Sequence, residues 1–138
     1  SERQLSNYAA KAYVAVDPSA ALHRALELRA DNVVYRAGYA PTRRAARQAV
    51  SHGHFTVNGK RITTPSQHLN AGDVIAVREG NRTSPLYAGL AERENVKPVP
   101  AWLKVDITAY NAEVTGDPQY NLVETGLDYR TVFEFYSR

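Results

Sequence analysis

The dipeptide Asn58-Gly59 constrains the fold of this chain more than any other short stretch of its 138 residues. Both central residues of a type I′ turn need a positive φ, which asparagine and glycine adopt most easily. The dipeptide lies between His54–Val57 and Lys60–Ile62, and we therefore predict that these two segments form a β-hairpin. Val74–Val77 (VIAV) follows a further turn signal and is predicted to add a buried strand.

The segment that precedes the hairpin has the pattern of a short, capped helix. Thr42 can cap its first turn, and Gly53 can end it in a left-handed turn. Its predicted buried stripe consists of Ala46, Ala49 and Val50. These small residues permit close packing against an earlier helical piece, Asp31–Ala37, which Gly38 ends. The pattern predicts an α+β module of two helices packed on a small antiparallel sheet.

The remaining elements are less regular. A helix is predicted to begin at Pro18-Ser19 with Ser19 as its cap, and a short helix is predicted over Leu86–Glu94. Trp102–Val105 alternates like a strand, whereas residues 111–121 (NAEVTGDPQYN) are expected to be turn-rich.

The C-terminal tail allows two interpretations. Thr131–Tyr136 (TVFEFY) has the propensity of a strand. The large side chains of the tail nevertheless recur at helical spacing, at Tyr129, Val132, Phe133 and Tyr136. We favour a helix.

Charge is distributed unevenly along the chain, whose net charge is +3. Residues 29–82 carry nine Lys and Arg against three acidic residues, whereas the rest of the chain carries eight basic and eleven acidic residues. A basic middle segment with acidic flanks favours a module that binds a polyanion. There is no cysteine, and no apolar run approaches the ~18 residues of a membrane span. We therefore expect a globular protein without disulfides, thiolate metal sites or a membrane segment.

The predicted helix and hairpin bring together side chains suited to an RNA backbone. Clustered arginines release counterions from phosphates, and the guanidinium fork fits two phosphate oxygens. The helix start at Thr42 adds backbone N–H groups, and the turn at Gly53 lets the backbone approach a ligand. The candidate contacts are Arg43, Arg44, Arg47, Ser51, His52, His54, Asn58, Lys60 and Arg61. A second set of candidates consists of Arg29, Arg36, Thr42, Arg78 and Arg82.

Each candidate also has a plainer interpretation. The arginines could form a solvated helix face, and Tyr35 and Tyr39 fit packing around the helix turn better than stacking on bases. His52 and His54 could bind a metal, but a His-x-His without cysteine is a weak signature, and we expect no metal or other cofactor. No glycine-rich phosphate loop, Gly-x-Ser-x-Gly or His-Glu-x-x-His occurs, so catalysis has no support.

Three short pieces within Leu26–Glu79 are distinctive: DNVVYR, TRxxARQxVSHGH and VNGKR. With them, this segment resembles the RNA-binding module of the S-four family, the fourth protein of the small ribosomal subunit. The segment PVPAWLKVD and the ending VFEFYSR are similar to other parts of that family, so the resemblance extends from about Leu22 to Arg138.

The resemblance implies both a domain organisation and a function. Residues 1–27 and 122–138 would form a helical subdomain, and residues 28–121 the inserted RNA-binding module with its connecting segment, its basic core being 29–82. The protein would be a structural component of the small subunit, not an enzyme. It would bind the 5′ domain of small-subunit ribosomal RNA, nucleate assembly and help to line the path along which messenger RNA enters. Neighbouring ribosomal proteins, S-five among them, and messenger RNA would be its further partners, on a cytoplasmic or an organellar ribosome.

Two other classes of protein remain open. The same module occurs on pseudouridine synthases and on a tRNA synthetase, but such an enzyme needs a catalytic domain, and the remaining ~80 residues are below the usual size for one. A stand-alone RNA-binding stress protein that rescues stalled large subunits is the other alternative. The ending Phe135–Arg138 (FYSR) favours the ribosomal family over it.

Overall fold

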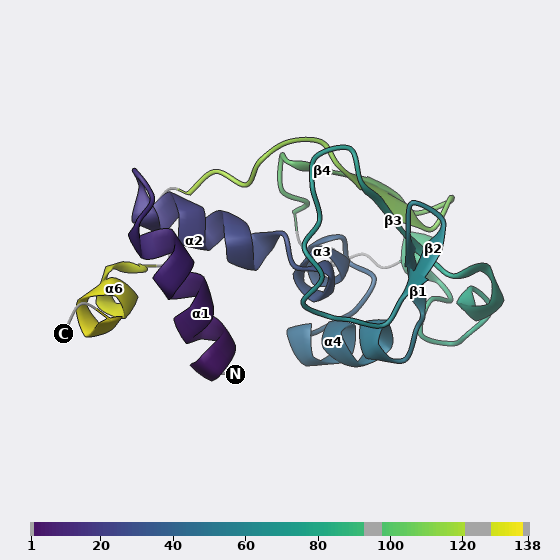
Figure 1. The fold of residues 1–138 in the computed structure, drawn as a ribbon. Helices are drawn as coiled ribbons and strands as arrows, with labels where there is room; N and C mark the ends of the chain where they lie inside the picture. The colour runs from purple at the N-terminus through teal and green to yellow at the C-terminus, as the bar shows by residue number, and fades with distance from the viewer. Residues whose placement is uncertain (1, 93–97, 121–127, 137–138) are drawn as a thin grey trace. The chain divides into compact units, whose positions relative to one another are not determined.

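The computed structural model describes residues 2–92, 98–120 and 128–136, which form two compact units (Figure 1). Unit 1 combines the two ends of the chain, Ser1–Glu27 and Pro118–Arg138, and unit 2 is the continuous segment Leu28–Asp117. The second boundary expected from the sequence, between residues 121 and 122, lies outside the described residues.

Unit 1 is built from three helices in the part that the structure describes. They are α1 (Glu2–Tyr13), α2 (Pro18–Glu27) and α6 (Arg130–Tyr136). The helical interpretation of the tail is therefore confirmed. The buried cluster of unit 1 contains Ala12, Leu22 and Tyr129, and Nδ1 of His23 lies 3.0 Å from the hydroxyl of Tyr129. This hydrogen bond ties the segment before α6 to α2.

The cap of α2 differs from the predicted one. Asp17 Oδ1 accepts a hydrogen bond from the backbone N–H of Ala20 at 3.2 Å, and the Asp17 carbonyl accepts one from Ala21. The prediction of Ser19 as the cap is wrong. Pro18 has the φ of a first helical residue and no N–H to satisfy, so the helix starts at the proline and its cap moves back to Asp17.

Unit 2 begins with the helices α3 (Ala30–Arg36) and α4 (Arg43–Ser51). The chain leaves α3 through Gly38, whose φ is +89°, as the sequence predicts. At the start of α4, Oγ1 of Thr42 accepts a hydrogen bond from the backbone N–H of Ala45 at 3.0 Å. The predicted cap of this helix is therefore confirmed.

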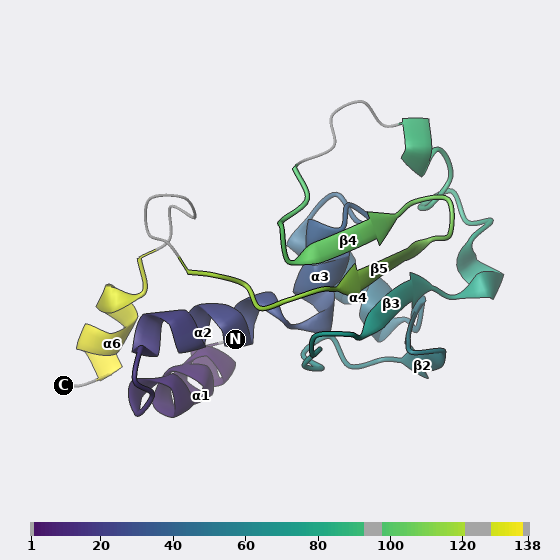
Figure 2. The ribbon, with the colours of Figure 1, turned by 90° about the horizontal axis from the view of Figure 1, so that it is seen from above.

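A five-stranded antiparallel sheet completes unit 2, with its strands in the order β2-β1-β3-β5-β4 (Figure 2). The strands are β1 (Phe55–Val57), β2 (Lys60–Ile62), β3 (Val74–Val77), β4 (Leu103–Asp106) and β5 (Asn111–Val114). The β1–β2 hairpin turns at Asn58 and Gly59, whose φ angles are +51° and +84°. These values are those of a type I′ turn, and the predicted hairpin and third strand are confirmed.

Strand β5 lies in a stretch that the sequence predicts to be turn-rich. It pairs with β3 on one side and β4 on the other, inside the sheet. The prediction is wrong for Asn111–Val114, because asparagine, alanine and glutamate are poor strand formers and conceal the strand locally. Tyr110, with a φ of +57°, reverses the chain after β4, and the two neighbouring strands then supply hydrogen-bond partners.

The long segment after β3 contains only 3-10 turns in its described part, η1 (Glu79–Asn81) and η2 (Leu90–Glu92). The helix predicted over Leu86–Glu94 is therefore wrong in the residues that the structure describes, and residues 93 and 94 lie outside them. Gly89 has a φ of +70°, which interrupts a right-handed helix. The segment is fastened instead by Tyr87, whose side chain is buried.

Helices α3 and α4 pack on one face of the sheet and enclose the core of unit 2 (Figures 1 and 2). Its fully buried side chains include Val33, Val50, Phe55, Leu69 and Ile75. The predicted α+β class is confirmed. Because the inner side of α4 is occupied by this core, its opposite side faces solvent.

Candidate nucleic-acid interface

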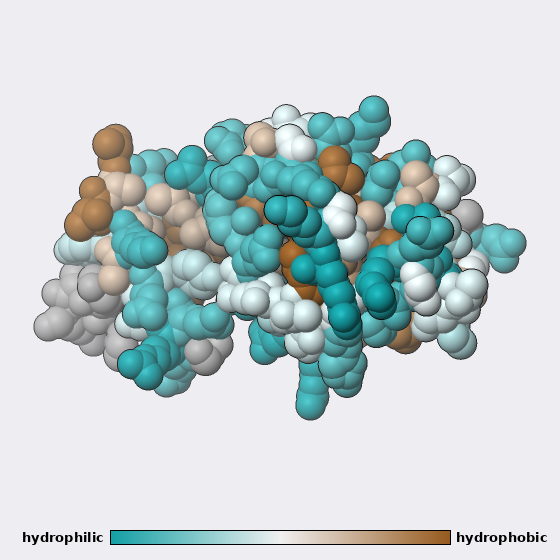
Figure 3. All heavy atoms as spheres, turned by 45° about the vertical axis from the view of Figure 1, so that its right-hand side comes forward, coloured by the Kyte–Doolittle hydropathy of each residue, from teal (hydrophilic) through white to brown (hydrophobic). Residues whose placement is uncertain are grey.

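The outer face of α4 carries three exposed arginines, Arg43, Arg44 and Arg47. Arg47 lies four residues after Arg43 and three after Arg44, so the three occupy neighbouring positions on one side of the helix. The helix itself contains no acidic residue. Hydrophilic side chains cover most of the side of unit 2 that Figure 3 presents. We call these arginines, together with Lys60 and Arg61 of β2, the basic face.

Arg43 is stacked on an aromatic ring. Its guanidinium carbon lies 4.5 Å from the centroid of the Tyr35 ring, and that of Arg36 lies 5.8 Å from the same centroid. Such stacking uses the flat face of the guanidinium, and Arg43 remains exposed at the surface. Tyr39 is buried, and its hydroxyl donates to the backbone carbonyl of Asn111 at 2.7 Å. Both tyrosines pack around the helix turn, as the plainer interpretation expects.

A buried carboxylate connects α3 to the basic face. Asp31 accepts hydrogen bonds from Nε and Nη2 of Arg29 at 3.1 and 3.0 Å, and Nε of Arg47 lies 3.6 Å from the same carboxylate. The Arg29 side chain is only 13% exposed, so its charge serves this ion pair. The Arg47 side chain is 61% exposed and extends towards solvent beyond the carboxylate. Asp31 therefore orients Arg47 without removing it from the surface.

Arg61 folds over the turn that ends α4. Its Nε donates to the carbonyl of Gly53 at 3.2 Å, and its Nη2 donates to the carbonyl of His52 at 3.4 Å. Gly53 has a φ of +77°, and a Cβ at this position would collide with the guanidinium of Arg61. Glycine is thus required here by the backbone and by the arginine above it. Lys60, next to Arg61, is exposed.

Asn58 is used by the hairpin itself. Its Nδ2 donates to Oδ1 of Asp73 at 2.9 Å, and its Oδ1 accepts from the backbone N–H of Val74 at 3.0 Å. Both ends of its amide are therefore engaged in joining the hairpin to β3. Asn58 shapes the loop that presents Lys60, and its side chain is less suited to an RNA contact than the sequence suggested.

His54 lies directly before β1 and faces the segment after β3. Its Nδ1 lies 2.9 Å from the hydroxyl of Tyr87, and its ring is 6.1 Å from that of His52. Burial, followed by the charges of His52 and Arg61, lowers the pKa of His54. Burial raises the pKa of Tyr87 to about 12. His54 is therefore neutral at pH 7, while His52 and Ser51 are exposed beside it.

The second set of candidates is more dispersed. Arg82 donates from Nε to the carbonyl of Val77 at 3.1 Å and lies 5.2 Å from the centroid of Tyr110, so it fastens the loop to the sheet. Arg78 is exposed, and its backbone N–H donates to the carbonyl of His54 at 2.7 Å. Of this set, Arg78 is the residue best placed to extend the basic face.

Asp31 and Tyr87 shape the basic face, and the sequence singled out neither of them. The pairing of Asp31 with Arg47 joins two helices, and that of Tyr87 with His54 joins a loop to a strand. Helix periodicity relates only residues that are three or four apart in the sequence, so it does not reveal either of these pairs. An isolated tyrosine in a polar loop was the only signal for Tyr87.

Neither a metal cluster nor a membrane helix occurs among residues 2–92, 98–120 and 128–136. No three His, Asp or Glu side chains gather there as a metal ion would need. No helix there is both long enough and apolar enough to cross a bilayer.

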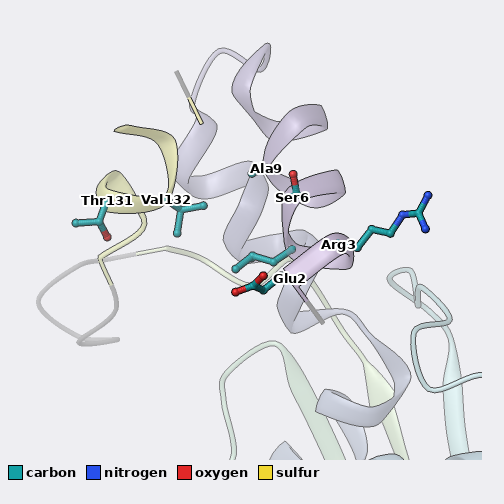
Figure 4. A pocket seen from close by; sticks show the side chains of 7 residues that line it. Glu2, Arg3, Ser6, Ala9, Thr131 and Val132 are labelled. Atoms are coloured by element: carbon teal, nitrogen blue, oxygen red, sulfur yellow. The ribbon is translucent and has the colours of Figure 1, made fainter. Parts of the chain in front are cut away.

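Unit 1 contains a groove of about 750 Å³ where α1 faces α6 (Figure 4). It is lined by Glu2, Arg3, Leu5, Ser6, Ala9, Thr131 and Val132. Figure 4 shows Arg3 extending away from α6. The described residues that line the groove include the hydroxyls of Ser6 and Thr131 and the carboxylate of Glu2, but no histidine.

Comparison with known proteins identifies the segment that carries the basic face. Residues 28–75 match the S4 domain family. The matched segment includes α3, α4, the β1–β2 hairpin and the start of β3. It therefore contains Asp31, the arginines of α4 and the turn at Gly53.

Curated relatives match a larger part of the chain. The small ribosomal subunit protein uS4 of Persephonella marina is 44% identical over 112 residues, which are 81% of this chain and 55% of that protein. The uS4 protein of Thermotoga maritima is 42% identical over 139 residues, which are 99% of this chain and 66% of that protein. A third uS4 protein, from Heliobacterium modesticaldum, is 41% identical over 117 residues, 85% of this chain and 56% of the relative. The chain thus spans between about half and two thirds of the length of these relatives.

Proposed function

Because this chain belongs to the uS4 family of small ribosomal subunit proteins, we propose that it is a structural component of that subunit, without catalytic activity, and binds small-subunit ribosomal RNA through the basic face. The exposed row of Arg43, Arg44 and Arg47 on α4 is the observation that carries this proposal. A phosphate at the start of this helix meets arginine side chains and the N–H groups of the first turn together.

The basic face and the polar residues beside it have two different roles. The arginines of α4, with Lys60 and Arg61, neutralise phosphates and position the RNA. Exposed Ser51 and His52, beside the turn at Gly53, supply hydrogen bonds to riboses or base edges. Phosphate contacts provide most of the affinity, and the second group provides the preference for a particular RNA shape.

The finer parts of the proposal rest on the family. We propose that the RNA bound is the 5′ domain of small-subunit ribosomal RNA and that early binding there nucleates assembly of the subunit. In the assembled particle the protein then neighbours ribosomal protein S-five and helps to line the path along which messenger RNA enters. The ribosome is that of the cytoplasm or of an organelle.

Binding to the isolated 5′ domain across a salt series, with excess transfer RNA as competitor, tests the RNA partner. We expect binding that survives the competitor and weakens steeply with salt, because each phosphate contact contributes roughly 0.7 to 0.9 to the slope of log affinity against log salt. Binding that the competitor abolishes contradicts the specific partner and leaves a general polyanion-binding module.

Co-sedimentation with ribosomal subunits separates this function from the rescue of stalled large subunits. We expect the protein in the small-subunit fraction. Recovery with the large subunit instead contradicts the proposal and favours the rescue class.

A further inference from the structure

Tyr87 projects from the segment after β3 into the end of the basic face. Its side chain is 2% exposed, and its ring meets Phe55 edge-on, with the ring centroids 5.8 Å apart and the planes at 90°. Its ring centroid also lies 5.9 Å from that of His54, and its hydroxyl lies 2.9 Å from His54 Nδ1. The packing on Phe55 holds the ring, and the ring in turn places the hydroxyl against the histidine.

The surroundings of the hydroxyl decide which way the proton points. A buried hydroxyl that donates to nothing is costly, and among the described residues Nδ1 of His54 is the acceptor that the Tyr87 hydroxyl reaches, at 2.9 Å. The Tyr87 hydroxyl therefore donates, and Nδ1 accepts. A neutral imidazole carries one proton, which must then be on Nε2. An imidazolium would instead donate from Nδ1, and the hydroxyl proton of Tyr87 would then have no acceptor at His54.

We propose that Tyr87 is a positioning residue of the RNA interface, which holds His54 as its Nε2–H tautomer and makes the outer edge of the imidazole a fixed hydrogen-bond donor for an RNA oxygen. The proposal rests on the proposed RNA-binding function. Nε2 is on the side of the ring away from the Nδ1 that faces Tyr87, His54 is partly buried, and no hydrogen bond within the described residues occupies Nε2.

The groups around His54 favour an acceptor oxygen as its partner. The His52 ring lies on one side, and the Arg61 guanidinium lies over the adjoining Gly53. The backbone carbonyl of His54 is taken by the N–H of Arg78. Arg61 is the cation among these neighbours, and the hydroxyl of Tyr87 is committed to Nδ1. A phosphate, ribose or carbonyl oxygen of RNA fits these donors, whereas a donor group such as a base amine does not.

The lowered pKa of His54 agrees with this arrangement, because a neutral ring is the form that the tyrosine can hold. In the other tautomer, which carries its proton on Nδ1, Nε2 is unprotonated and presents a lone pair to the RNA. That nitrogen repels an RNA oxygen. Fixing the tautomer thus decides whether His54 supports or opposes binding at this point.

Nitrogen NMR of the His54 ring measures the tautomer directly. The sample is the full chain without RNA, at a pH above the pKa of His54, where the ring is neutral. In the wild-type protein we expect Nε2 with the shift of a protonated nitrogen and Nδ1 with that of an unprotonated one. In Tyr87→Phe, which keeps the ring on Phe55 and removes the hydroxyl, we expect the two shifts to move towards an average of both tautomers.

Binding to the 5′ domain RNA then tests the consequence in a double-mutant cycle. Tyr87→Phe should weaken binding about three- to tenfold, the range of one lost or misdirected hydrogen bond. The same change in a His54→Ala background should have almost no effect, because the tyrosine acts through the histidine. A second hydroxyl deletion, Tyr39→Phe, serves as the matched control and should leave RNA affinity unchanged, because the Tyr39 hydroxyl bonds the Asn111 carbonyl and not His54.

The outcomes separate the positioning role from the proposed function. A wild-type His54 protonated on Nδ1, or a Tyr87→Phe effect of equal size with and without His54, overturns the role of Tyr87. Failure of the wild-type protein to bind the RNA at any salt concentration overturns the proposed function as well. The expected shifts together with a coupled cycle support both.

Discussion

The two units of the chain are held together in different ways. In the described part of unit 2 the buried apolar cluster includes residues from both helices and all five strands. In the described part of unit 1 it consists of Ala12, Leu22 and Tyr129, with a buried histidine–tyrosine hydrogen bond beside it. Among the described residues, unit 2 therefore has the larger buried apolar cluster, and the smaller cluster of unit 1 lies beside a histidine–tyrosine hydrogen bond.

The basic face lies on unit 2, the unit with the larger described cluster. Clustered arginines repel one another, and a unit that carries them needs stability from elsewhere. The core of unit 2 supplies it, and the arginines are then separated or oriented by particular partners: the Tyr35 ring under Arg43, Asp31 beside Arg47 and the Gly53 carbonyl under Arg61.

The largest effect is expected from emptying the core of unit 2. Phe55→Ala removes a fully buried ring and should lower the free energy of unfolding of unit 2 by roughly 3–5 kcal/mol, with loss of RNA binding. Leu22→Ala in unit 1, also fully buried, should cost about 2–5 kcal/mol and leave the RNA affinity of unit 2 close to normal. Urea unfolding followed by amide NMR signals from each unit measures both. An equal loss of RNA binding in the two variants contradicts the independence of the units.

The basic face should dominate RNA affinity. Arg43→Ala with Arg44→Ala should weaken binding to the 5′ domain on the order of 10- to 100-fold and lower the salt slope by about 1.5 to 2. The matched control is Arg3→Ala with Lys11→Ala, which removes two exposed cations from α1 in unit 1. Filter binding or fluorescence anisotropy across a salt series measures affinity and slope. The assignment fails if the control changes the slope as much as the α4 pair does.

A matched pair of hydroxyl deletions compares the hydrogen bonds of one tyrosine hydroxyl in each unit. Tyr129→Phe removes the hydroxyl that lies 3.0 Å from His23 Nδ1 in unit 1, and Tyr39→Phe removes the hydroxyl that donates to the carbonyls of Asn111 and Asp106 in unit 2. Each should cost about 1–2 kcal/mol. Hydrogen exchange should show the loss in unit 1 for the first variant and in unit 2 for the second. If either variant loses protection from hydrogen exchange mainly in the other unit, the division of the chain into two separately stabilised units is contradicted.

The smallest effect is the pH dependence that His54 contributes. Its pKa is lowered in the folded state, so near pH 6 the unfolded chain binds more protons than the folded one at this residue. Stability therefore rises with pH in this range and falls as the pH drops below about 6.5, the ordinary value for histidine. His54→Gln removes the titration and should flatten the stability of unit 2 between pH 5 and 7 by a small amount. Denaturant midpoints across this range are the measurement, and an unchanged profile excludes the contribution of His54.

The elements that depend on a few adjacent residues could be predicted from the sequence. The Asn58-Gly59 turn, the Thr42 cap and the exit from α3 at Gly38 are each decided by the φ or the hydrogen bonds of a few adjacent residues. The helical spacing of the tail is local in the same sense. The α4 arginines could also be placed on one face, because the helix period relates them directly.

What the sequence by itself determined, then, is the set of local elements, the side of α4 that is basic and the family to which its short motifs point. The tertiary structure decided the rest: β5 as an inner strand, Asp31 between Arg29 and Arg47, and Tyr87 against His54. The physical reason is distance along the chain. A turn or a cap is stabilised by its neighbours in sequence, whereas a strand of poor formers or a buried hydrogen bond is stabilised by partners that only the folded core brings within reach.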